Sequence, residues 1–374
     1  MPICKTLCIS KPPKEYNKLF FGDYGNFQRI DKVAYPIFRT LAERSEGNTW
    51  FMNEIDYTKD RKGVEKLDPV AKRMFHLNIL YQNNMDSLVP NTFGLLSEIA
   101  SDTWLSYLYS RIATEEQIHS LSYSNGLFQV FGEKVTEMLD HIYRDPILQR
   151  RTEKEIESAN RFIQLIFKEE REDDTGKLAL VELLLRTYYL EGVKFPFSFF
   201  VTWTINKAYG NAIQGFSQAL KLIAWDEMTI HTTTGQNLLK ILMNDPSQGF
   251  SHLRREIEEM AYRMADETAQ LEFEWNKYLQ KEGPIPGYTL KIGEHFIKYW
   301  TDYRLKGIGL APIFNEPKSD VIDWFNNYRN LNKTQVALQE ADNTNYQKGT
   351  LKNDLDRFGE FHFTPPPRQI GVSI

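Results

Sequence analysis

Residues 116–123 read Glu-Gln-Ile-His-Ser-Leu-Ser-Tyr and form the centre of a long helical pattern that runs from Ser101 to about Gly132. Either Ser101 or Asp102 can cap the start of this helix. Side chains three and four residues apart share one face of a helix. By this rule, one largely apolar stripe contains Trp104, Leu108, Ile112, Glu116, His119 and Tyr123. A Glu-x-x-His pair alone is common and usually marks an ordinary surface pair, so the rest of the sequence decides its meaning.

Three further helical patterns each place a carboxylate among apolar residues on their inward face. Carboxylates are rarely buried without partners, so four of them on core-facing stripes require an explanation. Pro90 is expected to bend or end the first of these helices. The patterns and their ionisable residues are residues 69–96 with Asp86, residues 176–208 with Glu191, and residues 211–243 with Glu227 and His231.

Charge balance explains the four carboxylates. Burying them without partners would cost many kcal/mol of folding free energy. Two divalent cations would neutralise four carboxylates, and two neutral imidazoles would complete the coordination without adding charge. Ligands of these types suit iron or manganese and disfavour a metal that prefers thiolates. The arrangement matches that of ferritin-like di-iron proteins, in which two helices give one carboxylate each and two give a Glu-x-x-His pair.

The sequence therefore predicts an all-α fold with a ferritin-like four-helix core and additional outer helices. Tyr123 follows His119 by four residues, so we expect it on the same face beside the metals, where a phenol can donate one electron. Phe195 and Phe199 would make its surroundings apolar. Strong β-alternation is scarce, and the expected outer helices occupy residues 153–172, 251–281 and 291–305.

Composition limits the class of protein. The chain has 374 residues, a net charge of −5 and no block of lysine and arginine, so we expect no nucleic-acid partner. The richest apolar run, residues 181–205, contains four charged side chains, which is unsuited to a membrane span. The N-terminus lacks the apolar segment of a signal peptide, so the expected location is the cytoplasm. Only two cysteines, Cys4 and Cys8, are present, so cysteine redox chemistry would come mainly from a partner chain.

Two regions of the chain differ in composition. Residues 1–330 carry the helical patterns and are expected to form the di-metal domain with an N-terminal extension. Residues 331–374 are poor core material, and we expect them to be a flexible tail. This tail also carries aromatic side chains suited to docking on a partner, namely Tyr346, Phe358, Phe361 and Phe363.

Several stretches, in the same order along nearly the whole chain, resemble the small subunit of class I ribonucleotide reductase. Three of them read Glu-Gln-Ile-His-Ser-Leu-Ser-Tyr at 116–123, Leu-Glu-Gly-Val-Lys-Phe at 190–195 and Leu-Ile-Ala-Trp-Asp-Glu at 222–227. The others are residues 20–22, 35–38, 50, 54–56 and 81–87. The resemblance implies a subunit of ribonucleoside-diphosphate reductase whose di-iron site activates O2 to make a stable tyrosyl radical. A large subunit would use this radical to reduce ribonucleotides to deoxyribonucleotides.

The resemblance implies six metal ligands and two iron ions per chain, with manganese as an alternative. The first metal would be held by Asp86, Glu116 and His119, and the second by Glu191, Glu227 and His231.

The resemblance also implies a path for the radical. Tyr123 would carry the stable radical, and Trp50 would lie on a proton-coupled electron path. Asp226 would accept a hydrogen bond from the ring of His119 and so fix its orientation. Tyr346 would pass the radical to the large subunit. The chain would form a homodimer and dock on the large subunit through its C-terminal tail.

Three features depart from the family pattern. Glu227 and His231 are separated by one residue more than in Glu-x-x-His. We expect a local irregularity such as a π-bulge there, because an extra residue otherwise rotates the rest of the helix by about 100°. Trp225 stands where relatives often have arginine, and the tail continues past residues 353–358, which resemble the terminus of some relatives.

Three other interpretations remain open at the level of sequence. A ligand-binding di-metal oxidase of the same fold would normally have an apolar residue in place of Tyr123 and no docking tyrosine such as Tyr346. An iron-storage ferritin would be far shorter and would lack Trp50 and the long tail. A metal-free helical bundle would bind neither iron nor manganese.

Overall fold

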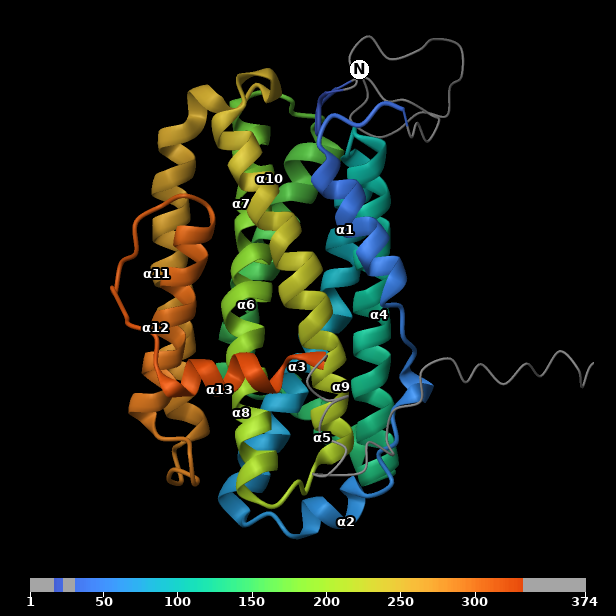
Figure 1. Cartoon of the computed structure of the whole chain (residues 1–374), viewed down its shortest axis with the longest axis vertical. Helices are drawn as coiled ribbons and strands as arrows, with labels where there is room; N and C mark the ends of the chain where they lie inside the picture. Colours follow the sequence, from blue (N-terminus) through green and yellow to red (C-terminus); the bar gives the residue numbers. More distant parts are fainter. Residues whose placement is uncertain (1–16, 23–30, 332–374) are drawn as a thin grey trace, which may run out of the picture.

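Four long helical rods form the centre of the molecule (Figure 1). The structure is a computed structural model that describes residues 17–22 and 31–331. Two of the rods are single helices, α3 (Pro69–Ile99) and α4 (Thr103–Phe131). The third rod consists of α7 (Asp174–Tyr189) and α8 (Phe195–Ala208), and the fourth of α9 (Gln214–Trp225) and α10 (Thr232–Asn244). Short π-helical segments join the halves of these two rods, namely η4 (Leu190–Lys194) and η5 (Asp226–His231).

The helices α3 and α4 each begin after a residue that can cap a helix N-terminus. Asp102 caps α4 by accepting a 2.8 Å hydrogen bond from the backbone N–H of Leu105, and Asp68 caps α3 in the same way. Pro90 lies inside α3, but the helix continues to Ile99, so the proline does not end it. Pro90 itself is buried, as are Val89, Thr92 and Phe93, and this packing offsets the one backbone hydrogen bond that proline cannot make.

Outer helices cover this core on several sides (Figure 1). On one side α11 (Arg254–Leu279) packs against α12 (Leu290–Gly307), and α13 (Asp320–Tyr328) contacts α12. The helix α6 (Pro146–Phe162) packs on α7 and continues into a π-helical turn, η3 (Ile163–Lys168). On another side α1 (Pro36–Gly47) packs on α4. The shorter elements are α2 (Asp60–Glu65), α5 (Lys134–Asp140) and 3₁₀ turns at residues 52–54, 141–143, 246–248 and 251–253.

The expected all-α fold is confirmed. Apart from two isolated β-bridges, the regular structure within residues 17–22 and 31–331 is helical. The outer helix expected at residues 153–172 begins earlier, at Pro146, because Asp145 caps it there. Four helices were not predicted, namely α1, α2, α5 and α13, and α1 begins with Pro36, a residue suited to the first turn of a helix.

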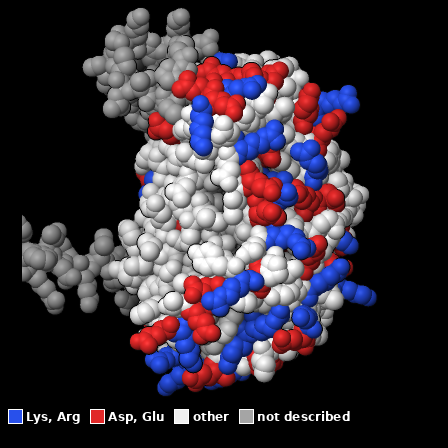
Figure 2. Space-filling model, turned by 180° about the vertical axis from the view of Figure 1, so that it is seen from behind, with Lys and Arg blue, Asp and Glu red and all other residues white. Residues whose placement is uncertain are grey.

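The expected flexible tail lies outside the described residues, together with Tyr346, so its properties stay predictions. In the described ranges, every helix is too short or too polar to cross a lipid bilayer. On the face seen in Figure 2, acidic and basic side chains are interspersed around an uncharged area. That face therefore lacks the broad basic surface typical of nucleic-acid binding.

Candidate metal centre

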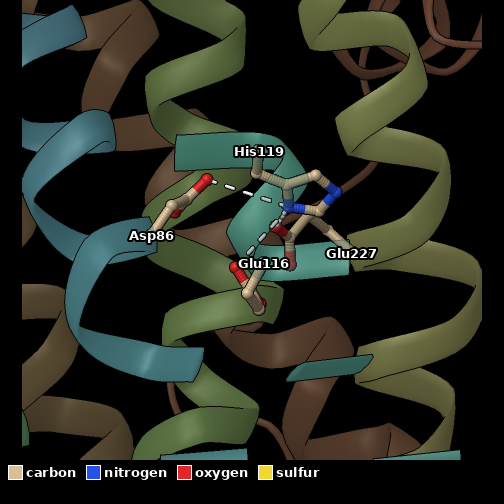
Figure 3. A group of neighbouring side chains, drawn as sticks. All are labelled: Asp86, Glu116, His119 and Glu227. Atoms are coloured by element: carbon tan, nitrogen blue, oxygen red, sulfur yellow. Dashed lines mark ion pairs between the residues drawn. The ribbon is translucent and has the colours of Figure 1, made fainter. Parts of the chain in front are cut away.

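Six ionisable side chains meet between the four rods. They form two groups, and the ligand atoms of each group all lie within 4.8 Å of one another. One group is Asp86, Glu116, His119 and Glu227 (Figure 3), and the other is Glu116, Glu191, Glu227 and His231. All six side chains are buried. The structure thus brings together every ligand expected from sequence, and it adds that Glu116 and Glu227 belong to both groups, where a carboxylate can bridge two ions.

The residues of the cluster come from two kinds of helix. Asp86 lies on α3, while Glu116 and His119 lie on α4, and the remaining three come from the π-helical segments. The irregularity expected between Glu227 and His231 is confirmed, because η5 spans both of them. In η5 the N–H of the residue that follows His231 bonds to the carbonyl of Glu227, five residues back. This wider turn absorbs the extra residue and keeps both side chains on the core face.

The cluster contains more acceptors than donors. Among the described residues, both carboxylate oxygens of Asp86, Glu116 and Glu191 are buried without a hydrogen-bond partner. The same is true of Glu227 Oε1 and His119 Nδ1. Leaving such groups unpaired in the interior costs free energy, which bound cations would recover. The residues present therefore fit a pair of divalent metal ions.

The pKa shifts of side chains in the cluster also favour the binding of cations. Burial raises the pKa of Asp86 well above its ordinary value, and the negative charges of Glu116 and Glu227 raise it further. Burial alone would lower the pKa of His119 and His231, but the surrounding carboxylates outweigh it and raise both. A cluster that binds protons this strongly is also one that attracts metal cations.

Each histidine directs Nδ1 into the cluster and Nε2 toward a carboxylate outside it. For His119, Nδ1 lies 3.5 Å from Glu116 Oε2, and Nε2 lies 3.1 Å from Asp226 Oδ2. For His231, Nδ1 lies 3.1 Å from Glu116 Oε1, and Nε2 lies 2.9 Å from Glu115 Oε2. A carboxylate on one ring nitrogen fixes the ring and leaves the other nitrogen for a metal.

Glu115 is the residue at this site that sequence reasoning missed. It is buried and also accepts a hydrogen bond from Ser45 Oγ. Burial would raise the pKa of Glu115, but the hydrogen bond and charge of His231 outweigh it, and the pKa is lowered. The available signal was its place four residues before His119, which puts it at the edge of the same stripe.

Trp50 and Asp226 form a contact series that leads to the cluster, as expected. The indole Nε1 of Trp50 donates a 2.8 Å hydrogen bond to Asp226 Oδ2, the same oxygen that faces the ring of His119. The Trp50 ring also stacks on that of His119, with centroids 5.9 Å apart. Trp50 is only 2% exposed, whereas the next residue, Phe51, is 43% exposed. The series therefore runs from close to the surface to the clustered side chains.

Tyr123 lies one helical turn from His119 on α4 and is fully buried. Among the described residues its hydroxyl has no hydrogen-bond partner. Burial raises the pKa of Tyr123 well above its ordinary value, and the nearby negative charge of Asp86 adds to this effect. Phe195 and Phe199 are also buried, and they stack on each other with centroids 6.1 Å apart. The phenol therefore stays protonated in an enclosed position.

Comparison with known sequences identifies a family. The family model described as ribonucleotide reductase, small chain, matches residues 29–321. The ribonucleoside-diphosphate reductase subunit beta of Buchnera aphidicola subsp. Baizongia pistaciae is 27% identical over 373 residues, covering 94% of this chain and 96% of that protein. The ribonucleoside-diphosphate reductase 1 subunit beta of Salmonella typhimurium is also 27% identical, with 90% and 93% covered.

Solved structures share the fold. The ribonucleotide reductase R2 subunit from Clostridium botulinum superposes with a TM-score of 0.79 at 23% identity, covering 88% of this chain and 99% of that one. The dimanganese(II)-NrdF of Streptococcus sanguinis gives a TM-score of 0.66 at 18% identity, covering 82% and 100%. The fold, the buried cluster and a family match over most of the sequence agree, and the chain belongs to the ribonucleotide reductase small-chain family.

Proposed function

We propose that this small subunit of a ribonucleoside-diphosphate reductase binds two metal ions between its four rods and stores an oxidising equivalent as a radical on Tyr123. The observation that carries the proposal is the pair of overlapping ligand groups, each containing a histidine held by an outer carboxylate. A large subunit would use the radical to reduce ribonucleotides.

The six clustered residues are the proposed ligands. Their donor types suit iron and manganese alike, and a similarly folded protein is dimanganese. We propose two iron ions for this chain, which when bound would supply the reaction with O2 that side chains alone cannot perform. Glu116 and Glu227 belong to both groups and would help to hold both ions. The remaining ligands would be Asp86 and His119 for one ion and Glu191 and His231 for the other.

The surroundings of Tyr123 support its role as the radical site. Its phenol keeps its proton in the resting state because burial raises its pKa. On oxidation it would give up one electron and that proton. Full burial then shields the ring from water and from solutes that would quench a radical. A ligand-binding di-metal oxidase has no need of such an oxidisable residue at this position.

The contact series from Trp50 to His119 supports an electron path. Asp226 bonds to both rings through one oxygen, so it can hold a proton between them while an electron passes. Beyond Trp50 we propose that the C-terminal tail docks on the large subunit and that Tyr346 relays the radical. The support for this last step, and for a homodimer, is the family resemblance.

The central test is electron paramagnetic resonance at low temperature after loading the metal-free protein with ferrous iron and O2. The wild-type chain should show a tyrosyl signal, and Tyr123→Phe should bind iron and consume O2 without it. Tyr109→Phe is the matched control, because Tyr109 is another buried tyrosine on α4. Metal uptake and O2 consumption without any tyrosyl signal in the wild-type chain would favour the oxidase interpretation instead.

A second test addresses Tyr346. The variant Tyr346→Phe should keep its metal content, its Tyr123 radical and its affinity for the large subunit. It should lose nucleotide reduction, because phenylalanine cannot be oxidised at the potential of a tyrosine. Assays with excess large subunit, and with radical content measured in the same sample, separate these effects. Full activity would make Tyr346 an ordinary tail residue.

A further inference from the structure

The third rod contains a proline at a position where an α-helix needs an amide. Pro196 follows Gly192 by four residues, so in an α-helix its N–H would bond to the Gly192 carbonyl. Proline has no N–H, and its ring crowds the carbonyl four residues back. The π-helical segment η4 ends at Lys194, two residues before this proline. The backbone beside Glu191 therefore lacks one of its usual internal hydrogen bonds.

Arg304 of α12 supplies a donor to this carbonyl from outside the rod. Its Nε donates a 3.0 Å hydrogen bond to the carbonyl of Gly192. A second hydrogen bond joins the third rod to α12, because the hydroxyl of Tyr188 donates to the Arg304 carbonyl at 2.8 Å. A Cβ atom at residue 192 would lie 2.5 Å from Arg304 Nε. A glycine is therefore needed at this position if the arginine is to approach.

The contacts of Arg304 differ from those of the other buried arginines near this rod. Arg151 and Arg186 each place Nη2 2.6 Å from a carboxylate oxygen, on Glu272 and Glu267 respectively. Arg304 is also buried, but it lies against the ring of Trp300 and directs Nε to a backbone carbonyl. Within residues 17–22 and 31–331, its position thus serves the backbone of η4 and not an ion pair.

We propose that Arg304 is a positioning residue for Glu191. It takes the place of the missing Pro196 amide as donor to the Gly192 carbonyl, and it thereby holds η4 in its π-helical form. Glu191 is the residue next to Gly192, so the same contact fixes where its carboxylate enters the metal cluster. The inference rests on the proposed function. It predicts an effect on the metal group that contains Glu191, and little effect on Asp86 and its neighbours on the regular helices.

The test is a titration of the metal-free, full-length chain with Mn²⁺, with the free ion followed by electron paramagnetic resonance. Asp86→Asn and Glu191→Gln identify which of the two dissociation constants belongs to which group. In Arg304→Gln, the constant of the Glu191 group should rise by roughly tenfold or more, while the other changes less than about twofold. Adding Pro196→Ala restores a backbone amide and should recover most of the lost affinity.

A matched control separates positioning from a general loss of stability. Arg186→Gln removes a buried arginine on α7 that pairs with Glu267, so it should lower the thermal midpoint without changing either constant. If Arg304→Gln does not fold, Gly192→Ala tests the same contact, because the added methyl group displaces the guanidinium but keeps its charge.

Three results would overturn the inference. They are unchanged Mn²⁺ binding in the Arg304→Gln or Gly192→Ala variant, equal weakening of both groups, and failure of Pro196→Ala to restore affinity. Fewer than two Mn²⁺ ions on the wild-type chain would be a different outcome, since it would overturn the proposed function itself.

Discussion

The two halves of the metal centre are built on different kinds of helix. Regular α-helices carry one half, and backbone hydrogen bonds hold these helices except at Pro90, which has no N–H to donate to the carbonyl of Asp86. The other half lies on π-helical segments that also use side chains as donors. Thr232 Oγ1 donates to the Glu227 carbonyl at 2.7 Å, and Arg304 donates to the Gly192 carbonyl. On α3, Ser87 Oγ also donates to a carbonyl of its own helix, that of Asn83, so the feature that distinguishes the π-helical half is the donor from a distant helix, Arg304 of α12.

The largest effect should come from a side chain that belongs to both metal groups. Glu116 belongs to both metal groups, whereas Asp86 belongs to only one. Glu116→Ala should therefore reduce metal content from about two ions per chain to well below one, while Asp86→Ala keeps about one. Elemental analysis after loading and desalting gives the numbers. Normal loading of the Glu116 variant would remove it from the ligand set.

A smaller effect should distinguish the carboxylates that hold the two histidines. Asp226 faces His119 in the regular half, and Glu115 faces His231 in the π-helical half. Replacing either carboxylate by alanine should weaken one metal group by about 10- to 100-fold and leave the other group nearly unchanged. Mn²⁺ titration of the two variants makes each the control for the other. If either variant weakened both groups equally, the halves would not be separable.

The smallest effect should come from a hydroxyl within the fourth rod. Thr232→Val removes the donor to the Glu227 carbonyl at about the same volume, and should lower the free energy of unfolding by about 1 kcal/mol. Thr234→Val is the matched control, because its Oγ1 donates to the Ile230 carbonyl at 2.8 Å. Urea denaturation should show similar losses for both variants. Only the Thr232 variant should also weaken Mn²⁺ binding, and identical titrations would show that η5 needs no such support.

The regular half could be predicted from the sequence because its ligands follow the helical period. Asp86, Glu116 and His119 fall on apolar stripes of uninterrupted helices, and the structure places them together. In the other half, the extra residue before His231 predicted the bulge of η5. The segment η4 was not predicted, although Pro196 in mid-helix was a sign of it.

Features that depend on tertiary contacts could not be predicted from the sequence. Glu115 was missed because Glu115 and Glu116 are consecutive in the sequence before His119, and no local pattern shows that both are buried. The contact between Glu115 and the ring of His231 reveals it. The helices α1 and α13 are short, and their packing on the core supports them more than their own sequence does. The contact of Arg304 joins residues more than 100 positions apart, which no local pattern records.

The four-residue spacing from Glu227 to His231 also matters for how such chains are found and aligned. A search that requires two copies of Glu-x-x-His would score this chain as lacking a ligand. An alignment that forbids gaps inside helices would shift His231 and all of α10 by one column, and would report a substitution where the histidine is present. A search pattern that also accepts Glu-x-x-x-His as the second of the two motifs, with a one-residue gap allowed in mid-helix, would recover chains built in this way.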